Sequence, residues 1–130
     1  MSNVITFGTF DVFHVGHLNI LQRAKKFGDR LFVGVSSDAL NFQKKRRYPV
    51  YEQHDRMSII SGIKYVDAVF LEESLDLKAH YIKKYNADIL IMGDDWKGKF
   101  DHFSSMTKVI YLERTPTIST TSLIEVIKRR

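Results

Sequence analysis

The chain has 130 residues, a formal net charge of +5, 44% hydrophobic residues and no cysteine. This length and composition predict one packed domain over residues 1–130, and the lack of cysteine excludes disulfides, thiolate zinc sites and a cysteine nucleophile. The positive charge favours an anionic partner. Charge alone does not decide whether this partner is a nucleotide, a phosphorylated metabolite, nucleic acid or a membrane surface.

Short apolar runs alternate with helix-like patterns along the whole chain. The first run, residues 4–8, precedes a stretch at 16–27 in which Leu18, Leu21 and Ala24 recur at three-residue spacing, which indicates an amphipathic helix stopped by Gly28. Further strands are predicted at 31–36, 67–71, 88–93 and 109–112, and further helices at 57–63, 77–85 and 123–127. Between the second strand and the second helix, residues 38–50 are predicted to form a polar, basic loop that is a candidate lid.

Near-continuous apolar strands separated by helices are typical of a parallel sheet covered on both faces. We therefore predict an α/β fold, a single Rossmann-like domain with a five-stranded parallel sheet and helices on both faces. Ligands of such sheets bind beyond the carboxyl ends of the strands. The candidate site is therefore formed by the segments that follow strands, at 8–17, 36–47, 93–101 and 113–121.

The first of these segments, GTFDVFHVGH, places His14 and His17 three residues apart at a predicted helix start. Free backbone N–H groups and the helix dipole favour an anion there, imidazole N–H groups can stabilise charge on a phosphoryl group, and Gly16 leaves room for a phosphate. Local hydrogen bonding by one histidine is the alternative. Metal ligation is disfavoured because no third ligand stands at a recognisable spacing.

The last segment, RTPTISTT, contains a guanidinium and several hydroxyls before the C-terminal helix. Arg114 can contact a phosphate through two N–H groups, and the hydroxyls of residues 119–121 lie near a helix N-terminus. A plain N-cap, with Ser122 and Glu125 as a capping box, is the alternative. Four consecutive hydroxyl residues exceed what capping needs, so phosphate binding is favoured, with capping as a second role.

The segment MGDDWKGKFD adds two carboxylates at a strand end. Asp94 and Asp95 can accept hydrogen bonds from a ribose or a base amine, bind Mg²⁺ through water, or form a solvated turn. Trp96 can stack on a ligand or pack beneath the loop. The basic run Lys44 to Arg47 is either a solvated surface or part of a phosphate site.

Together GTFDVFHVGH, MGDDWKGKFD and RTPTISTT resemble the signatures of the cytidylyltransferase family, and the similarity covers essentially the whole chain. The chain is most similar to family members that use glycerol 3-phosphate. The resemblance implies transfer of CMP from CTP to glycerol 3-phosphate by direct in-line attack, giving CDP-glycerol and pyrophosphate for cell-wall or capsule synthesis. It also implies Mg²⁺ as cofactor and a homodimer.

The resemblance further implies a role for each matching residue. The catalytic residues would be His14, His17, Lys44 and Arg114. The nucleotide would contact Thr9, Phe10, Gly16, Arg46, Asp95, Thr115, Ser119, Thr120 and Thr121. The acceptor would contact Asp11, Lys44, Arg56 and Lys78, and Mg²⁺ would be held mainly by the CTP phosphates.

Two positions leave the acceptor open. The family's glycerol enzymes have tryptophan where this chain has Leu75, and the family has glycine where it has Thr117. The alternative acceptor is another small phosphorylated alcohol, sugar or amino-acid derivative.

Other function classes are disfavoured. An adenylyltransferase fits RTPTISTT less well, a tRNA synthetase fragment lacks its KMSKS loop, and a structural protein leaves the four segments unexplained. A nucleic-acid-binding module should show basic residues interleaved with aromatics along one face. Here the basic residues concentrate at predicted strand ends with hydroxyls and acids, so we expect no nucleic-acid partner. With no run of 18 apolar residues and no signal-peptide pattern, we expect no membrane span and a cytoplasmic location.

Overall fold

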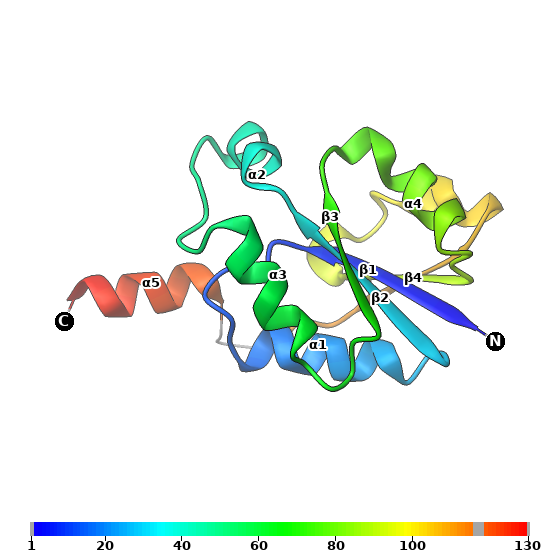
Figure 1. Ribbon diagram of the computed structural model, residues 1–130, viewed down its shortest axis with the longest axis horizontal. Helices are drawn as coiled ribbons and strands as arrows, with labels where there is room; N and C mark the ends of the chain where they lie inside the picture. The colour runs from blue at the N-terminus through cyan, green and yellow to red at the C-terminus, as the bar shows by residue number, and fades with distance from the viewer. Residues whose placement is uncertain (1, 116–118, 130) are drawn as a thin grey trace.

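A computed structural model describes residues 2–115 and 119–129, and its centre is one parallel sheet with the strand order β3-β2-β1-β4-β5 (Figure 1). Thr117 therefore lies outside the described residues. Every neighbouring pair of strands is parallel. The strands are β1 Asn3–Gly8, β2 Arg30–Ser36, β3 Ala68–Glu72, β4 Ile89–Gly93 and β5 Lys108–Leu112. The predicted five-stranded parallel sheet is confirmed.

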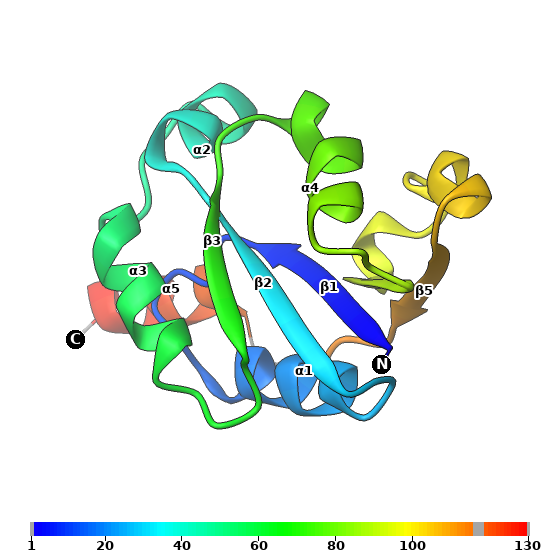
Figure 2. The ribbon, with the colours of Figure 1, turned by 45° about the vertical axis from the view of Figure 1, so that its right-hand side comes forward.

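Helices cover both faces of the sheet, as predicted (Figure 2). On one face, Leu21 and Ala24 of one helix and Ile60 of another pack against β1 and β2. On the other face, Tyr81 and Ile82 pack against the opposite side chains of the same strands. The helices are α1 Val15–Lys25, α2 Asp38–Lys45, α3 Gln53–Ser61, α4 Lys78–Lys84 and α5 Thr120–Arg129, with short 3₁₀ helices at Leu75–Leu77, Asp94–Trp96 and Asp101–Ser105. In the described part of the chain, no helix combines the length and the apolar character that a membrane span needs.

The prediction of a loop over residues 38–50 is wrong for residues 38–45, which form α2. The hydroxyl of Ser37 caps this helix by accepting a hydrogen bond from the Leu40 N–H at 3.0 Å. Asp38 in the first turn and the lysines of the last turn suit the helix dipole. The helix ends at Arg46, whose φ of 59° is left-handed. Only the remaining residues, 46–52, are irregular.

The C-terminal helix α5 starts three residues before its predicted position. The Ser119 hydroxyl accepts a hydrogen bond from the Ser122 N–H at 3.1 Å, and the Ser122 hydroxyl donates to the Ser119 carbonyl at 2.9 Å. The alternative of a capping box formed by Ser122 and Glu125 is therefore wrong, and Ser119 is the cap. Figure 1 shows α5 extending away from the sheet, and none of its residues is buried.

Candidate functional site

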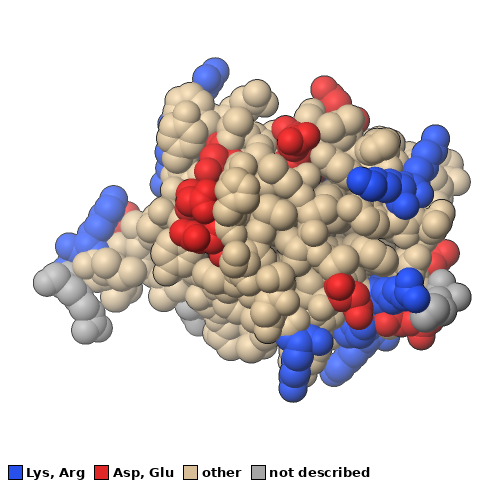
Figure 3. Space-filling view, viewed as in Figure 1, with Lys and Arg blue, Asp and Glu red and all other residues tan. Residues whose placement is uncertain are grey.

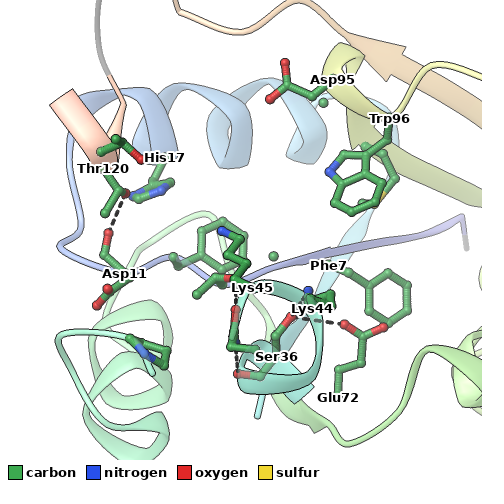
Figure 4. A pocket seen from close by; sticks show the side chains of 18 of the residues that line it. Phe7, Asp11, His17, Ser36, Lys44, Lys45, Glu72, Asp95, Trp96 and Thr120 are labelled. Carbon is green, nitrogen blue, oxygen red and sulfur yellow. Dashed lines mark hydrogen bonds between the residues drawn. The ribbon is translucent and has the colours of Figure 1, made fainter. Parts of the chain in front are cut away.

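A cavity of about 800 Å³ opens at the carboxyl ends of the strands. Its lining includes the strand-end residues Gly8, Ser36, Glu72 and Gly93. All four segments that the sequence singled out contribute residues to it, as expected for a parallel α/β sheet. In Figure 4, His17, Asp11 and Thr120 lie on one side of the cavity, and Ser36, Lys44 and Glu72 lie on the other.

The two histidines use the same ring nitrogen to hold the start of α1. Nδ1 of His14 accepts a hydrogen bond from the Gly16 N–H at 3.0 Å, and Nδ1 of His17 accepts one from the His14 N–H at 3.2 Å. Each neutral ring therefore carries its proton on Nε2, which stays available as a donor. The rings stack with centroids 3.8 Å apart, and His17 lines the cavity. Local capping and phosphate binding are thus compatible roles.

Both imidazoles are held in the neutral form. Burial, and then the Arg114 guanidinium, lowers the pKa of His14. Burial, and then the neighbouring His14, lowers the pKa of His17 to about 3. Near pH 7 the pair therefore presents N–H donors without adding positive charge of its own.

Asp11 ties together three segments around the cavity. Its carboxylate accepts backbone N–H bonds from Val12, Val50 and Tyr51 at 3.1, 2.7 and 2.9 Å. Its carbonyl accepts a hydrogen bond from the Thr120 hydroxyl at 2.8 Å. The β1–α1 loop, the loop at 46–52 and the start of α5 are thereby fixed to one another. The direct acceptor contact predicted for Asp11 stays a prediction, since its carboxylate already serves the backbone.

Two lysines share the other side of the cavity with a buried carboxylate, and we call Ser36, Lys44, Glu72 and Lys78 the lysine cluster. Glu72 accepts from Lys78 Nζ at 2.5 Å and from the Ser36 hydroxyl at 3.2 Å. The Lys44 ammonium lies 3.5 Å from the same hydroxyl. The sequence predicted the two lysines and missed Ser36 and Glu72. The missed signal was Glu72 itself, a carboxylate that ends an apolar strand.

The cluster also acts electrostatically on Lys44. Burial lowers the pKa of Lys44, the Glu72 carboxylate opposes that effect, and the positive charges of Lys78, Lys45 and Arg56 add to it. Glu72 thus favours the charged form of Lys44 among several cations.

Arg56 is a structural residue in this fold. Its side chain is fully buried and lies outside the cavity lining. It donates to the carbonyls of Tyr51, Thr9 and Ser36 at 2.9, 2.8 and 2.8 Å and to the Asp38 carboxylate at 2.7 Å. The acceptor-binding role predicted for Arg56 does not fit this placement, because its guanidinium instead joins the ends of β1 and β2 to α2 and to the loop at 46–52.

We expect Arg56→Lys to lower the free energy of unfolding by about 2 kcal/mol, because a lysine ammonium cannot reproduce the planar set of donors and leaves buried carbonyls unpaired. Urea unfolding followed by circular dichroism measures the change. Arg30→Lys is the matched control, since Arg30 is exposed at the start of β2. Equal stability of the two variants would contradict the structural role of Arg56.

The remaining site residues fall into two groups. Thr9, Phe10, Asp95, Thr120 and Thr121 line the cavity. So do Lys45, Arg47 and Trp96, whose roles the sequence left open, and Asn41, which the sequence did not single out. The residues outside the lining are His14, Gly16, Arg46, Arg114, Thr115 and Ser119. The catalytic roles of His14 and Arg114 and the nucleotide contacts of the other four stay predictions. Lys45 and Arg47, the chain neighbours of Arg46, do line the cavity.

Arg114 and Thr115 are nevertheless connected to neighbouring site elements. Arg114 is exposed and lies 3.4 Å from both carboxylate oxygens of Asp95, which lines the cavity. The hydroxyl of Thr115 accepts a hydrogen bond from the Asn19 side chain on α1 at 3.1 Å. Trp96 lines the cavity, and its ring centroid lies 5.5 Å from that of Phe100. The Trp96 side chain therefore packs on the loop and also faces the cavity.

Comparison with known proteins gives consistent matches. The Cytidylyltransferase-like family model matches residues 5–126. The chain is 47% identical over 128 residues to glycerol-3-phosphate cytidylyltransferase of Bacillus subtilis, covering 98% of both chains. It is 41% identical to the enzyme of the same name from Staphylococcus aureus, covering 95% of this chain and 92% of that one. Among solved structures, a lipopolysaccharide core biosynthesis protein from Thermoplasma volcanium matches with a TM-score of 0.77 at 27% identity, over 88% of this chain and 98% of that one.

Proposed function

Because the chain belongs to the cytidylyltransferase-like family, we propose that it transfers CMP from CTP to glycerol 3-phosphate, releasing CDP-glycerol and pyrophosphate. The observation that carries the proposal is one cavity that has the neutral His17, with the His14 ring stacked on it, on one side and the lysine cluster on the other. Near-full-length similarity to enzymes named for this reaction supports the same substrates.

The two sides of the cavity suit two phosphorylated substrates. The triphosphate of CTP binds at the start of α1, where the Nε2–H group of His17, on which the His14 ring stacks, and the hydroxyl of Thr121 are available. The phosphate of glycerol 3-phosphate binds at the lysine cluster. Arg114, whose exposed side chain makes a long contact to Asp95, serves the triphosphate.

The transfer needs no protein nucleophile. An acceptor phosphate oxygen forms a bond to the α-phosphorus of CTP, the bond from that phosphorus to the bridging oxygen breaks, and its electron pair leaves with pyrophosphate. The protein positions the two substrates and stabilises charge on the transferring group through N–H donors and ammonium groups.

Mg²⁺ is part of the proposal as a partner of CTP. Among residues 2–115 and 119–129, no group of three or more His, Asp or Glu side chains is placed to hold a metal ion. A magnesium ion bound through triphosphate oxygens and water fits this arrangement, and it would neutralise charge on the phosphates.

On one face of the molecule, the basic side chains are not arranged as a nucleic-acid site needs. On the face shown in Figure 3, Lys and Arg side chains lie in separate groups with acidic side chains between them. A nucleic-acid site would present a continuous basic stripe. The proposal includes a cytoplasmic location, where CTP is available, and a homodimeric assembly, which sedimentation analysis would test.

Pyrophosphate release tests the substrates directly. The protein is incubated with Mg²⁺, CTP or ATP, and a panel of glycerol 3-phosphate, ribitol 5-phosphate, phosphoethanolamine and phosphoserine. We expect the highest kcat/KM with CTP and glycerol 3-phosphate, with CDP-glycerol identified by mass spectrometry. A higher kcat/KM with another phosphorylated acceptor would show that the proposed acceptor is wrong and that cytidylyl transfer is right. Turnover with ATP and none with CTP would refute the proposal.

A further inference from the structure

Resting on the proposed function, we propose that Glu72 is a positioning residue for acceptor binding. Its carboxylate fixes Lys78 directly and Lys44 through Ser36, so that the two ammonium groups form a preset pair for the acceptor phosphate. Neither the sequence patterns nor the function of the relatives assigns this role to Glu72.

The burial of Glu72 is the first support. This residue ends β3, is 1% exposed and still belongs to the cavity lining. A buried carboxylate is costly unless it is paired and hydrogen-bonded, and both oxygens of Glu72 have a partner on a different element. Because the two carboxylate oxygens are already used on Lys78 and Ser36, its effect on a ligand passes through the groups that it holds.

Lys78 is the more tightly held of these groups. It is 3% exposed, and its ammonium lies 4.4 Å from the ring centroid of Phe7 and 5.1 Å from that of Phe100. The carboxylate and the two rings hold the ammonium in place. One N–H of the ammonium is used on Glu72, which leaves two donors for a ligand in the cavity.

Ser36 carries the influence of Glu72 to Lys44. The Ser36 hydroxyl donates to Glu72 and accepts from Lys44, and Figure 4 shows the three side chains close together. The carboxylate also opposes the lowering of the Lys44 pKa by burial. Without its negative charge, two neighbouring ammonium groups would repel each other in a partly dry site, and the acceptor phosphate would meet a less ordered pair.

Glu72→Gln tests the inference because it keeps the shape and removes the charge. We expect the KM for glycerol 3-phosphate to rise about tenfold with the KM for CTP changed less than about twofold, since the lost interaction serves one substrate only. Glu73→Gln is the matched control, because Glu73 is the next residue, is exposed and lies outside the cavity lining. Equal rises in both KM values, or no rise in the acceptor KM, would overturn the inference.

A double-mutant cycle with Lys78→Met separates positioning from a general loss of structure. We expect Glu72→Gln to raise the acceptor KM much less in the Lys78→Met background, where the group that it positions is gone. A full tenfold rise in that background would overturn the inference. Ser36→Ala leaves the buried ion pair intact and should raise the acceptor KM about threefold through Lys44 alone, which keeps the test available where Glu72→Gln does not fold.

The wild-type protein distinguishes the two proposals. If it releases no pyrophosphate from CTP and glycerol 3-phosphate, the proposed function fails. If the wild type is active and Glu72→Gln has wild-type KM values, only the role of Glu72 fails.

Discussion

His17→Ala is expected to lower kcat by about 100- to 1000-fold, the usual loss when one preorganised donor to a transition state is removed. His17 lines the cavity, and its Nδ1 is occupied by the His14 N–H, so its Nε2–H is the donor that faces a substrate. Its low pKa makes this donor neutral near pH 7. The measurement is pyrophosphate release at saturating CTP and glycerol 3-phosphate.

Two further variants isolate that donor. His17→Asn keeps an oxygen that can accept the His14 N–H and lacks a donor at the Nε2 position, so we expect a similar loss of kcat. His54→Ala makes the same change at a side chain that is 76% exposed on α3, and it should leave kcat unchanged. Circular dichroism establishes that each variant is folded. A folded His17→Ala protein with wild-type kcat would contradict the role of His17.

Lys44→Ala is expected to lower kcat/KM for glycerol 3-phosphate by about 1000-fold, in the range seen when one partner of a desolvated charge pair is truncated. The Lys44 ammonium lines the cavity beside Ser36 and is the less enclosed cation of the lysine cluster. Its removal leaves Lys78 as the one remaining ammonium of the cluster for the acceptor phosphate. Steady-state kinetics with varied acceptor at saturating CTP measures the effect.

The matched control for Lys44→Ala is Lys83→Ala, an exposed lysine on α4 outside the cavity lining. It should retain wild-type kinetics. We expect the KM for CTP to change less than about threefold in Lys44→Ala, because the lysine cluster lies across the cavity from the histidine pair. An unchanged kcat/KM for the acceptor, or a loss confined to CTP, would place the acceptor phosphate elsewhere.

The sheet was predictable because its central strands β1, β2 and β4 are buried on both faces and therefore appear as continuous apolar runs. Val4 and Ile5 are both fully buried although they point to opposite faces, one toward α1 and the other toward α4. Helix α2 was missed because only Leu40 and Asn41 are buried in it, so it has no apolar stripe. The helix begins at the Ser37 cap and ends at Arg46, whose backbone is left-handed. Both are weaker sequence signals than an apolar periodicity.

The site was predictable where functional side chains follow a strand in the sequence. His17 and Asp95 are such cases, since the topology itself brings strand ends together. Long-range hydrogen bonds were not predictable. Arg56 looks like any helical arginine in the sequence, yet it contacts a carbonyl 47 residues away. Glu72 is paired at the cavity with Lys78 of α4, and this ion pair is seen only in the folded chain.

The loop between β1 and α1 contains two residues, Phe10 and Val12, in left-handed backbone conformations with φ of 53° and 47°. Such conformations cost about 1–3 kcal/mol for residues other than glycine and persist only when their surroundings impose them. Here the Asp11 carboxylate, between the two, supplies that constraint through three backbone amides. The conformational entropy of shaping this loop is therefore lost once, when the chain folds, and nucleotide enters a concavity that does not have to be rebuilt in each catalytic cycle.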